Sequence, residues 1–297
     1  MVVDFHCHSD HSDGTDPVTI VVEKAHEKAI SVLSITDHDT LSGQKDAAEL
    51  SSKMGIAYVK GVEIGCDFHE TLDILGYGMV STEDSIEKHL EQIRLKRNLR
   101  NTRILYKLRS LGIDITDEEL ESSFPGESLG RPHIASLIVK KGYAESNEDA
   151  FERFIGKYGI AYVEKERLSI KSAIELILSA KGIPVLAHPI SMMLNREDTV
   201  EMIKRMMSYG LRGIEVFYKV YDLETRNELL QISEDLGLLA SGGSDYHGEH
   251  KKNLELGIEI PDDIVYRFLE SLSADDNAPQ KSQWRFEIGV KRSEEHT

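Results

Sequence analysis

Short apolar runs alternate with longer amphipathic segments over much of the chain, and this alternation predicts strands and helices in turn. The seven predicted strands are residues 2–8, 31–36, 56–62, 72–76, 183–187, 213–217 and 238–241. The helices predicted between and after them are residues 17–29, 43–54, 172–181, 199–209, 223–236 and 262–272. Such alternation is typical of parallel sheets, so we expect an α/β fold.

Residues 81–165 interrupt this alternation and are predicted to be helical. A long, charged helix over residues 83–111 is followed by shorter helices over residues 116–122, 132–141 and 147–154. We interpret the stretch as a helical insertion that caps the substrate and divides the main domain into residues 1–80 and 166–272. Residues 273–297 are expected to form a polar tail with one apolar patch over residues 284–290 and a disordered end.

The first predicted strand ends in two histidines on one face, because side chains alternate along a strand. His6 and His8 share this face, and Asp13 follows in the next loop. An isolated pair of this kind is more often an ordinary surface or core feature than a metal site. Here, however, metal-competent side chains recur near later strand ends, namely His38, Glu63, Asp73, His188, Asp245 and His247.

These nine side chains exceed what one ion needs, so two or three divalent ions are expected. Mixed imidazole and carboxylate ligands favour Mn, Zn or Fe over Ca or Mg. Side chains from six strands converge in a ring more readily than in an open sheet. The pattern therefore predicts a barrel with its site at the carboxyl ends of the strands.

The charge balance limits the possible partners. The chain carries 52 acidic and 35 basic residues, a formal net charge of −17, which disfavours tracking along duplex or long single-stranded nucleic acid. A small anionic substrate remains compatible if metal ions dominate the field in one pocket. A local basic cluster from Arg94 to Arg109 is interpreted as an ordinary solvated helix face in preference to a phosphate contact.

Cellular location and assembly are only weakly constrained. The two cysteines, Cys7 and Cys66, are expected to be buried thiols in a reducing cytoplasm. No signal peptide is recognised, and no apolar run is long enough to cross a membrane. The sequence leaves the oligomeric state open.

Five short motifs give the chain a resemblance to the PHP (polymerase and histidinol phosphatase) phosphoesterases. They are His6-Cys7-His8, Thr36-Asp37-His38-Asp39, Gly61-Val62-Glu63, Ala187-His188-Pro189 and Gly243-Ser244-Asp245-Tyr246-His247, in the family's order. The resemblance covers roughly residues 1–270 and implies a distorted (β/α)7 barrel with three metal ions.

The resemblance also implies which residues hold each ion. One ion would be held by His6, His8, Glu63 and Asp245, a second by Glu63, His188 and Asp73, and a third by Asp13, His38 and His247. Asp73 stands where the family usually has histidine, which leaves the occupancy and metal preference of the second site open. His69 could replace it but is expected to be an exposed loop residue.

Gly130-Arg131-Pro132-His133-Ile134-Ala135 resembles the signature of one branch, which includes nucleoside 3',5'-bisphosphate phosphatases and 5'-to-3' exoribonucleases. We expect Arg131 and His133, at a helix start, to hold the phosphate that is not cleaved. Helix capping beside a surface arginine is the alternative. His188 or His247 could protonate the leaving group.

Three functions remain open. The first is phosphoester hydrolysis on a small nucleotide or short RNA, the second is hydrolysis of another small ester such as histidinol phosphate, and the third is metal binding without catalysis. No metal-binding or catalytic role is expected for the other histidines, His11, His26, His89, His250 and His296. Glu215 is expected to have either a supporting role beside the metal ligands or a ligand role itself.

Overall fold

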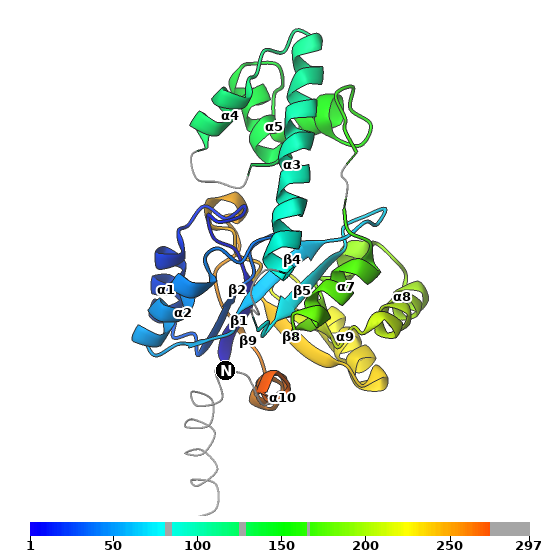
Figure 1. The fold of residues 1–297 in the computed structure, drawn as a ribbon. Coiled ribbons are helices and arrows are strands. Elements are labelled where there is room, and N and C mark those ends of the chain that lie inside the picture. Colours follow the sequence, from blue (N-terminus) through cyan, green and yellow to red (C-terminus); the bar gives the residue numbers. More distant parts are fainter. Residues whose placement is uncertain (81–84, 125–128, 165–166, 274–297) are drawn as a thin grey trace, which may run out of the picture.

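The computed structural model describes residues 1–80, 85–124, 129–164 and 167–273 (Figure 1). Within these residues nine strands form two sheets, with the strand orders β3-β2-β1-β9 and β4-β5-β6-β7-β8. The strands are β1 (Val2–Cys7), β2 (Val32–Ile35), β3 (Ala57–Tyr58), β4 (Gly61–Gly65), β5 (Asp73–Tyr77), β6 (Ile183–Leu186), β7 (Gly213–Tyr218), β8 (Leu239–Gly243) and β9 (Ile258–Glu259). The mixed α/β class is confirmed.

Two groups of helices accompany the sheets. Around the sheets lie α1 (Val18–Glu27), α2 (Gln44–Lys53), α7 (Ile170–Ser179), α8 (Arg196–Tyr209), α9 (Leu223–Leu236) and α10 (Asp262–Ser273) (Figure 1). The second group is α3 (Ser85–Ser110), α4 (Asp117–Ser123), α5 (Arg131–Lys140) and α6 (Asn147–Ala150), which continues into a π-helical turn over Phe151–Ile155. None of the described helices has the length and apolar character needed to cross a membrane.

Not every strand is parallel, contrary to the expectation from the alternating pattern. β5 pairs antiparallel with both β4 and β6, and β9 pairs antiparallel with β1. The segment between β4 and β5 is too short for a crossover helix, so the chain must return in the opposite direction. β9 is a two-residue strand that the sequence pattern did not reveal.

The single strand predicted over residues 56–62 is in fact two strands in different sheets, β3 and β4. The chain passes close to the end of β2 between them. A Cβ atom on Gly61 would lie 2.4 Å from Ser34 Oγ and 2.6 Å from Thr36 Cγ2, so only glycine fits there without displacement. As a consequence Glu63 lies in the middle of β4 rather than after a strand end.

Backbone hydrogen bonds join the two sheets near the ends of β1 and β2. On one side the Asp245 N–H donates to His6 O (2.7 Å) and the His8 N–H donates to Tyr246 O (2.9 Å). On the other side the Asp39 N–H donates to Glu63 O (2.9 Å). These contacts bring the ends of β1, β2 and β8 together with the middle of β4.

The described chain has separate hydrophobic cores in its sheets and in its second helical group. Buried aromatic rings of Phe5, Tyr77 and Phe268 pack together under the sheets, with centroid distances of 4.9 Å (Phe5–Phe268) and 5.2 Å (Tyr77–Phe268). Helix α3 contributes Ile86 to the main core and Ile104 to the second core. Figure 1 shows α3 rising from the sheets into the second helical group. One continuous helix therefore joins the two packing units.

Candidate metal centre and its pocket

The end of β1 places two buried imidazoles beside two buried carboxylates. His6 Nε2 and His8 Nε2 lie 3.4 and 3.2 Å from Glu63 Oε2, and 3.6 and 3.4 Å from Asp245 Oδ1. Both Nε2 atoms are buried and make no hydrogen bond. Buried polar atoms are normally satisfied, so this pair points to a missing electrophilic partner.

Glu63 lies at the centre of the cluster. Its Oε2 atom is also 3.3 Å from His38 Nε2, and its Oε1 atom is 3.0 Å from His188 Nε2. His188 Nε2 is in turn 3.7 Å from Asp73 Oδ2. Asp73 thus lies in the cluster at the position where histidine was expected.

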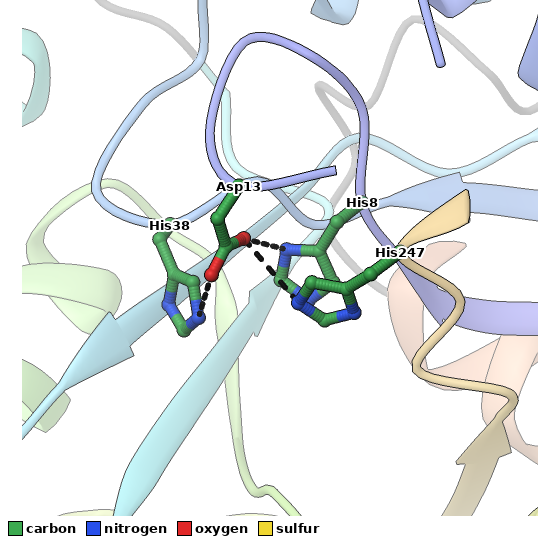
Figure 2. A group of neighbouring side chains, drawn as sticks. All are labelled: His8, Asp13, His38 and His247. Carbon is green, nitrogen blue, oxygen red and sulfur yellow. Dashed lines mark ion pairs between the residues drawn. The ribbon is translucent and has the colours of Figure 1, made fainter. Parts of the chain in front are cut away.

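A second group surrounds the carboxylate of Asp13, as Figure 2 shows. One oxygen is 3.7 Å from His38 Nε2, and the other is 3.5 Å from His8 Nδ1 and 3.3 Å from His247 Nε2. His8 therefore contacts this group through Nδ1 and the Glu63 group through Nε2. The nine residues singled out from the sequence lie in one continuous cluster.

Hydrogen bonds at Nδ1 orient two of these imidazoles. The Nδ1–H of His6 donates to Glu215 Oε1 (3.0 Å), and that of His247 donates to the carbonyl oxygen of Asp245 (2.8 Å). This tautomer leaves the Nε2 lone pair directed at the neighbouring carboxylates and available to a metal. Glu215 is fully buried and also accepts the His188 backbone N–H (2.7 Å), so it supports two candidate ligands.

The charges of the cluster reinforce one another. Burial opposes ionisation of Glu63 and Asp245, yet the surrounding imidazoles hold the pKa of both carboxyl groups well below their usual range. Burial likewise opposes protonation of His8 and His188, but the nearby carboxylates raise the pKa of His8 to about 10 and that of His188 to about 9. The site therefore favours positive charge at its centre.

The donor atoms fit divalent metal ions. Three subsets have ligand atoms within 4.8 Å of one another: His8, Asp13, His38 and His247; His6, His8 and Glu63; and His38, Glu63 and Asp73. Two ligands about 2.1 Å from one ion are roughly 3.0–3.4 Å apart, close to the nitrogen–oxygen distances found here. Imidazole and carboxylate donors together suit transition metals better than Ca or Mg.

The cluster opens into a cavity of about 550 Å³ whose other walls come from the second helical group. Its acidic and imidazole lining includes Asp13, His38, Glu63, Asp73, His188, Asp245 and His247, and its cationic lining comprises Arg97, Arg100, Arg131, Arg167 and Lys251. The cavity thus combines a candidate metal centre with cations able to hold an anion.

Comparisons with known proteins agree with this arrangement. The pattern of the PHP domain matches residues 4–182. The chain belongs to the PHP family. The family predicted from the sequence motifs is thereby confirmed.

Three similar proteins each align with at least 85% of this PHP chain. A 5'-3' exoribonuclease of Haemophilus influenzae is 30% identical over 85% of this chain and 94% of its own. A 3',5'-nucleoside bisphosphate phosphatase of Chromobacterium violaceum is 28% identical, covering 86% and 90%. The crystal structure of a protein described as a metal-dependent phosphoesterase, from Bifidobacterium adolescentis, is 29% identical with a TM-score of 0.78, covering 92% and 96%.

Two arginines contradict the interpretation of residues 94–109 as a solvated face. Arg100 is only 7% exposed, and its Nε–H donates to Val163 O (2.8 Å). Burial, with the neighbouring Arg131, lowers the pKa of Arg100 to about 10. Arg97 pairs with Asp39, and both arginines line the cavity. The sequence could not show this, because the orientation of α3 depends on its packing against two cores.

Residues 130–133 lie at the start of α5 and line the cavity. Gly130 donates its N–H to His133 Nδ1 (3.0 Å), and the Arg131 guanidinium lies 5.4 Å from the centre of the Phe151 ring. His133 therefore caps the helix while facing the cavity. The helix-capping contact named as the alternative and a position in the cavity wall are therefore both found at His133.

One histidine with no predicted role also lines the cavity. His250 lines the cavity, its ring is 6.0 Å from that of His133, and its Nδ1 lies 2.9 Å from Asp13 O. It lies within the 3₁₀ turn Gly248–Lys251 after β8 and has no ligand spacing that a sequence pattern would reveal. The exposed histidines outside the cavity are His11, His26, His69 and His89, and His296 lies outside the described residues.

The two cysteines agree with their predicted burial. Cys7 and Cys66 are buried free thiols. Burial raises the pKa of the Cys7 thiol well above its usual value, which disfavours the reactive thiolate.

We expect Glu215→Gln to weaken metal binding about 10- to 100-fold, because the amide can rotate to present a donor to His6 Nδ1 and would no longer stabilise its orientation. Metal titration followed by elemental analysis measures the change. Glu201→Gln, an exposed acid on α8, is the matched control. Equal metal affinity of the two variants would show that Glu215 has only a packing role.

Proposed function

We propose that this metal-dependent phosphoesterase acts on a small nucleotide of the 3',5'-bisphosphate type or trims short 5'-phosphorylated oligoribonucleotides. One observation carries the proposal, namely that a single cavity is lined both by metal-competent residues and by four arginines, of which Arg100 is buried. A substrate with two phosphate groups matches both walls, whereas a monoester matches only one. The names of the H. influenzae and C. violaceum relatives agree with such substrates.

We assign two or three divalent ions (Mn, Zn or Fe) to the cluster. His6, His8, Glu63 and Asp245 would hold one ion, Glu63, Asp73 and His188 a second, and Asp13, His38 and His247 a third. Divalent ions at such sites lower the pKa of water and neutralise phosphate oxygens. The central position of Glu63, with one oxygen near three imidazoles and the other near His188, supports its sharing between ions.

Whichever of His188 and His247 is not committed to a metal ion through Nε2 is the candidate for proton delivery to the leaving oxygen. Both line the cavity, and both contact only one or two carboxylates through Nε2. The Nδ1–H of His247 is held by the Asp245 carbonyl, which keeps the ring oriented while Nε2 faces the cavity. A fixed imidazole within reach of the leaving group suits general acid catalysis.

Arg131 and His133 would hold the phosphate that is not cleaved. Arg131 and His133 line the same cavity wall at the start of α5. Arg100 and Arg167 add charge, and the mutual repulsion among these guanidinium groups would be relieved by an anion between them. Lys251, paired with Asp245, lies between this wall and the metal cluster.

The architecture that we propose is a distorted (β/α)7 barrel formed by residues 1–80 and 166–272, with residues 81–165 as a substrate cap. The backbone hydrogen bonds between the two sheets and the separate core of the second helical group support this architecture and this division. The tail predicted over residues 273–297 lies almost entirely outside the described residues.

A metal and substrate panel tests the proposal. Metal removal should abolish hydrolysis and added Mn²⁺ should restore it, since nine candidate ligands surround the reacting region. Turnover is compared on a 3',5'-bisphosphate nucleotide, a 5'-phosphorylated trinucleotide RNA and histidinol phosphate. Preference for histidinol phosphate would indicate a small-ester phosphatase, and bound metal without turnover would indicate a non-catalytic module.

Arg131→Ala should lower kcat/KM on the bisphosphate about 10- to 100-fold, because one charge-assisted hydrogen bond is lost. The same variant should act almost normally on p-nitrophenyl phosphate, which has no second phosphate group. Arg153→Ala removes an exposed arginine from the same helical group and is the control. An equal loss on both substrates would contradict the binding role and indicate a part in the chemistry or in folding.

Asp73→His should retain or strengthen metal binding, because imidazole is a good ligand for the same transition metals. Asp73→Ala should reduce the number of bound ions, measured by elemental analysis under matched free-metal concentrations. Asp67→Ala, an exposed carboxylate near the same hairpin, serves as control. Unchanged stoichiometry in Asp73→Ala would exclude Asp73 as a ligand.

A further inference from the structure

The α3 helix concentrates positive charge in an otherwise acidic chain. Between residues 94 and 109 there is no acidic residue, while the net charge of the chain is −17. The basic residues of this stretch are Arg94, Lys96, Arg97, Arg100, Arg103, Lys107 and Arg109. Arg97 and Arg100 line the catalytic cavity, which leaves the cations further along the helix without an explanation in the proposed reaction.

These later residues line a second, open cavity of about 590 Å³. Its walls come from residues 102–109 of α3, including Arg103, Tyr106 and Lys107, and from Tyr162, Val163 and the acidic Glu164 opposite. The Tyr106 side chain is 70% exposed, although it is a large aromatic residue. The groove thus presents an accessible ring flanked by two exposed cations, a combination that binds single-stranded nucleic acid through base stacking and phosphate contacts.

The groove lies next to the catalytic cavity along α3. Arg100 lines the catalytic cavity and donates to the carbonyl of Val163, which lines the groove. Arg103 lies one helical turn further along. From Arg97 to Tyr106 the helix rises about 14 Å, the length of roughly four stacked nucleotides. A chain leaving the catalytic cavity can therefore reach Tyr106 within a few nucleotides.

We propose that this groove, defined by Arg103, Tyr106, Lys107 and Tyr162, binds the nucleotides of a single-stranded RNA that extend beyond the one held at the metal centre. The inference rests on the proposed phosphoesterase function and selects short RNA as a substrate class. Tyr106 stacks on a base, and Arg103 and Lys107 contact phosphate groups. Lys107 Nζ donates once to Tyr162 O and retains two further donors.

Charge favours RNA over a second copy of the protein on this face. A twofold interface would place the same basic face of each α3 against the other, so that like charges would meet. A polyanion instead neutralises them and releases counterions. The mostly acidic remainder of the chain limits binding to short RNA near the groove.

The test compares substrates of one to five nucleotides. For Tyr106→Ala we expect kcat/KM on a 5'-phosphorylated pentanucleotide RNA to fall roughly 5- to 100-fold, the range found for loss of one stacked base. For the double variant Arg103→Ala/Lys107→Ala we expect kcat/KM on the pentanucleotide to fall about 10-fold. The slope of log kcat/KM against log salt concentration should become less steep by roughly one unit. Hydrolysis of the 3',5'-bisphosphate mononucleotide should change less than about twofold, which also shows that the variants are folded.

Matched controls lie on the same helical group. Tyr158→Ala removes another exposed tyrosine, and Lys140→Ala/Lys157→Ala removes two exposed cations that line neither cavity. These controls should leave the pentanucleotide rate unchanged.

The outcomes separate this inference from the proposed function. Equal losses on mononucleotide and pentanucleotide, equal losses in the controls, or wild-type rates in all variants would overturn the RNA groove while leaving phosphoester hydrolysis intact. A pentanucleotide that is not hydrolysed by the wild type, beside a mononucleotide that is, would also overturn it. Dimerisation lost only in Tyr106→Ala would assign the face to a second copy instead. Absence of turnover on every phosphate ester would reject both proposals.

Discussion

The structure depends on a buried concentration of carboxylates and imidazoles around Glu63. Glu63 is 1% exposed, and Glu215 and His6 are fully buried. Ionised groups lose several kcal/mol of hydration on burial, so they persist only when opposite charge or hydrogen-bond donors surround them. Each carboxylate here is adjacent to at least one imidazole nitrogen, and metal ions would complete the compensation.

Other buried carboxylates hold the loops that carry the candidate metal ligands. Asp4 accepts the N–H groups of Ser244 (3.0 Å) and Gly257 (2.7 Å), and Asp37 accepts the N–H of Ser9 (2.8 Å). Ser9 follows His8, and Ser244 precedes Asp245. Burial raises the pKa of Asp4 despite these donors. The hydrogen bonds therefore fix the backbone on either side of the ligands, which is what a multidentate site requires.

Much of the site could be predicted from the sequence because most of its candidate ligands lie at or just beyond the ends of short apolar strands, in local motifs. The pairing of His6 with His8 needs only strand alternation, and later strand ends repeat the pattern. The break at Gly61 was not predictable, since it depends on how closely the chain passes β2. Arg100 and His250 were missed because a helix face and a loop acquire their surroundings only through tertiary packing.

The same packing couples α3 to the metal centre. Asp39 follows His38 and has a positive φ of 55°, a conformation that costs energy in a non-glycine residue but that aspartate tolerates better than most. Arg94 donates to the carbonyl oxygen of Asp39 (2.6 Å), and Arg97 pairs with its carboxylate.

Helix α3, which contributes Arg97 and Arg100 to the cationic lining of the cavity, therefore also holds the loop that positions His38. Since Ile86 of α3 belongs to the main core and Ile104 belongs to the second one, a displacement of α3 changes both sides of the cavity together. An anion that draws Arg97 toward itself also weakens its pairing with Asp39. We therefore expect anion binding near Arg97 and the geometry at His38 to be linked through α3.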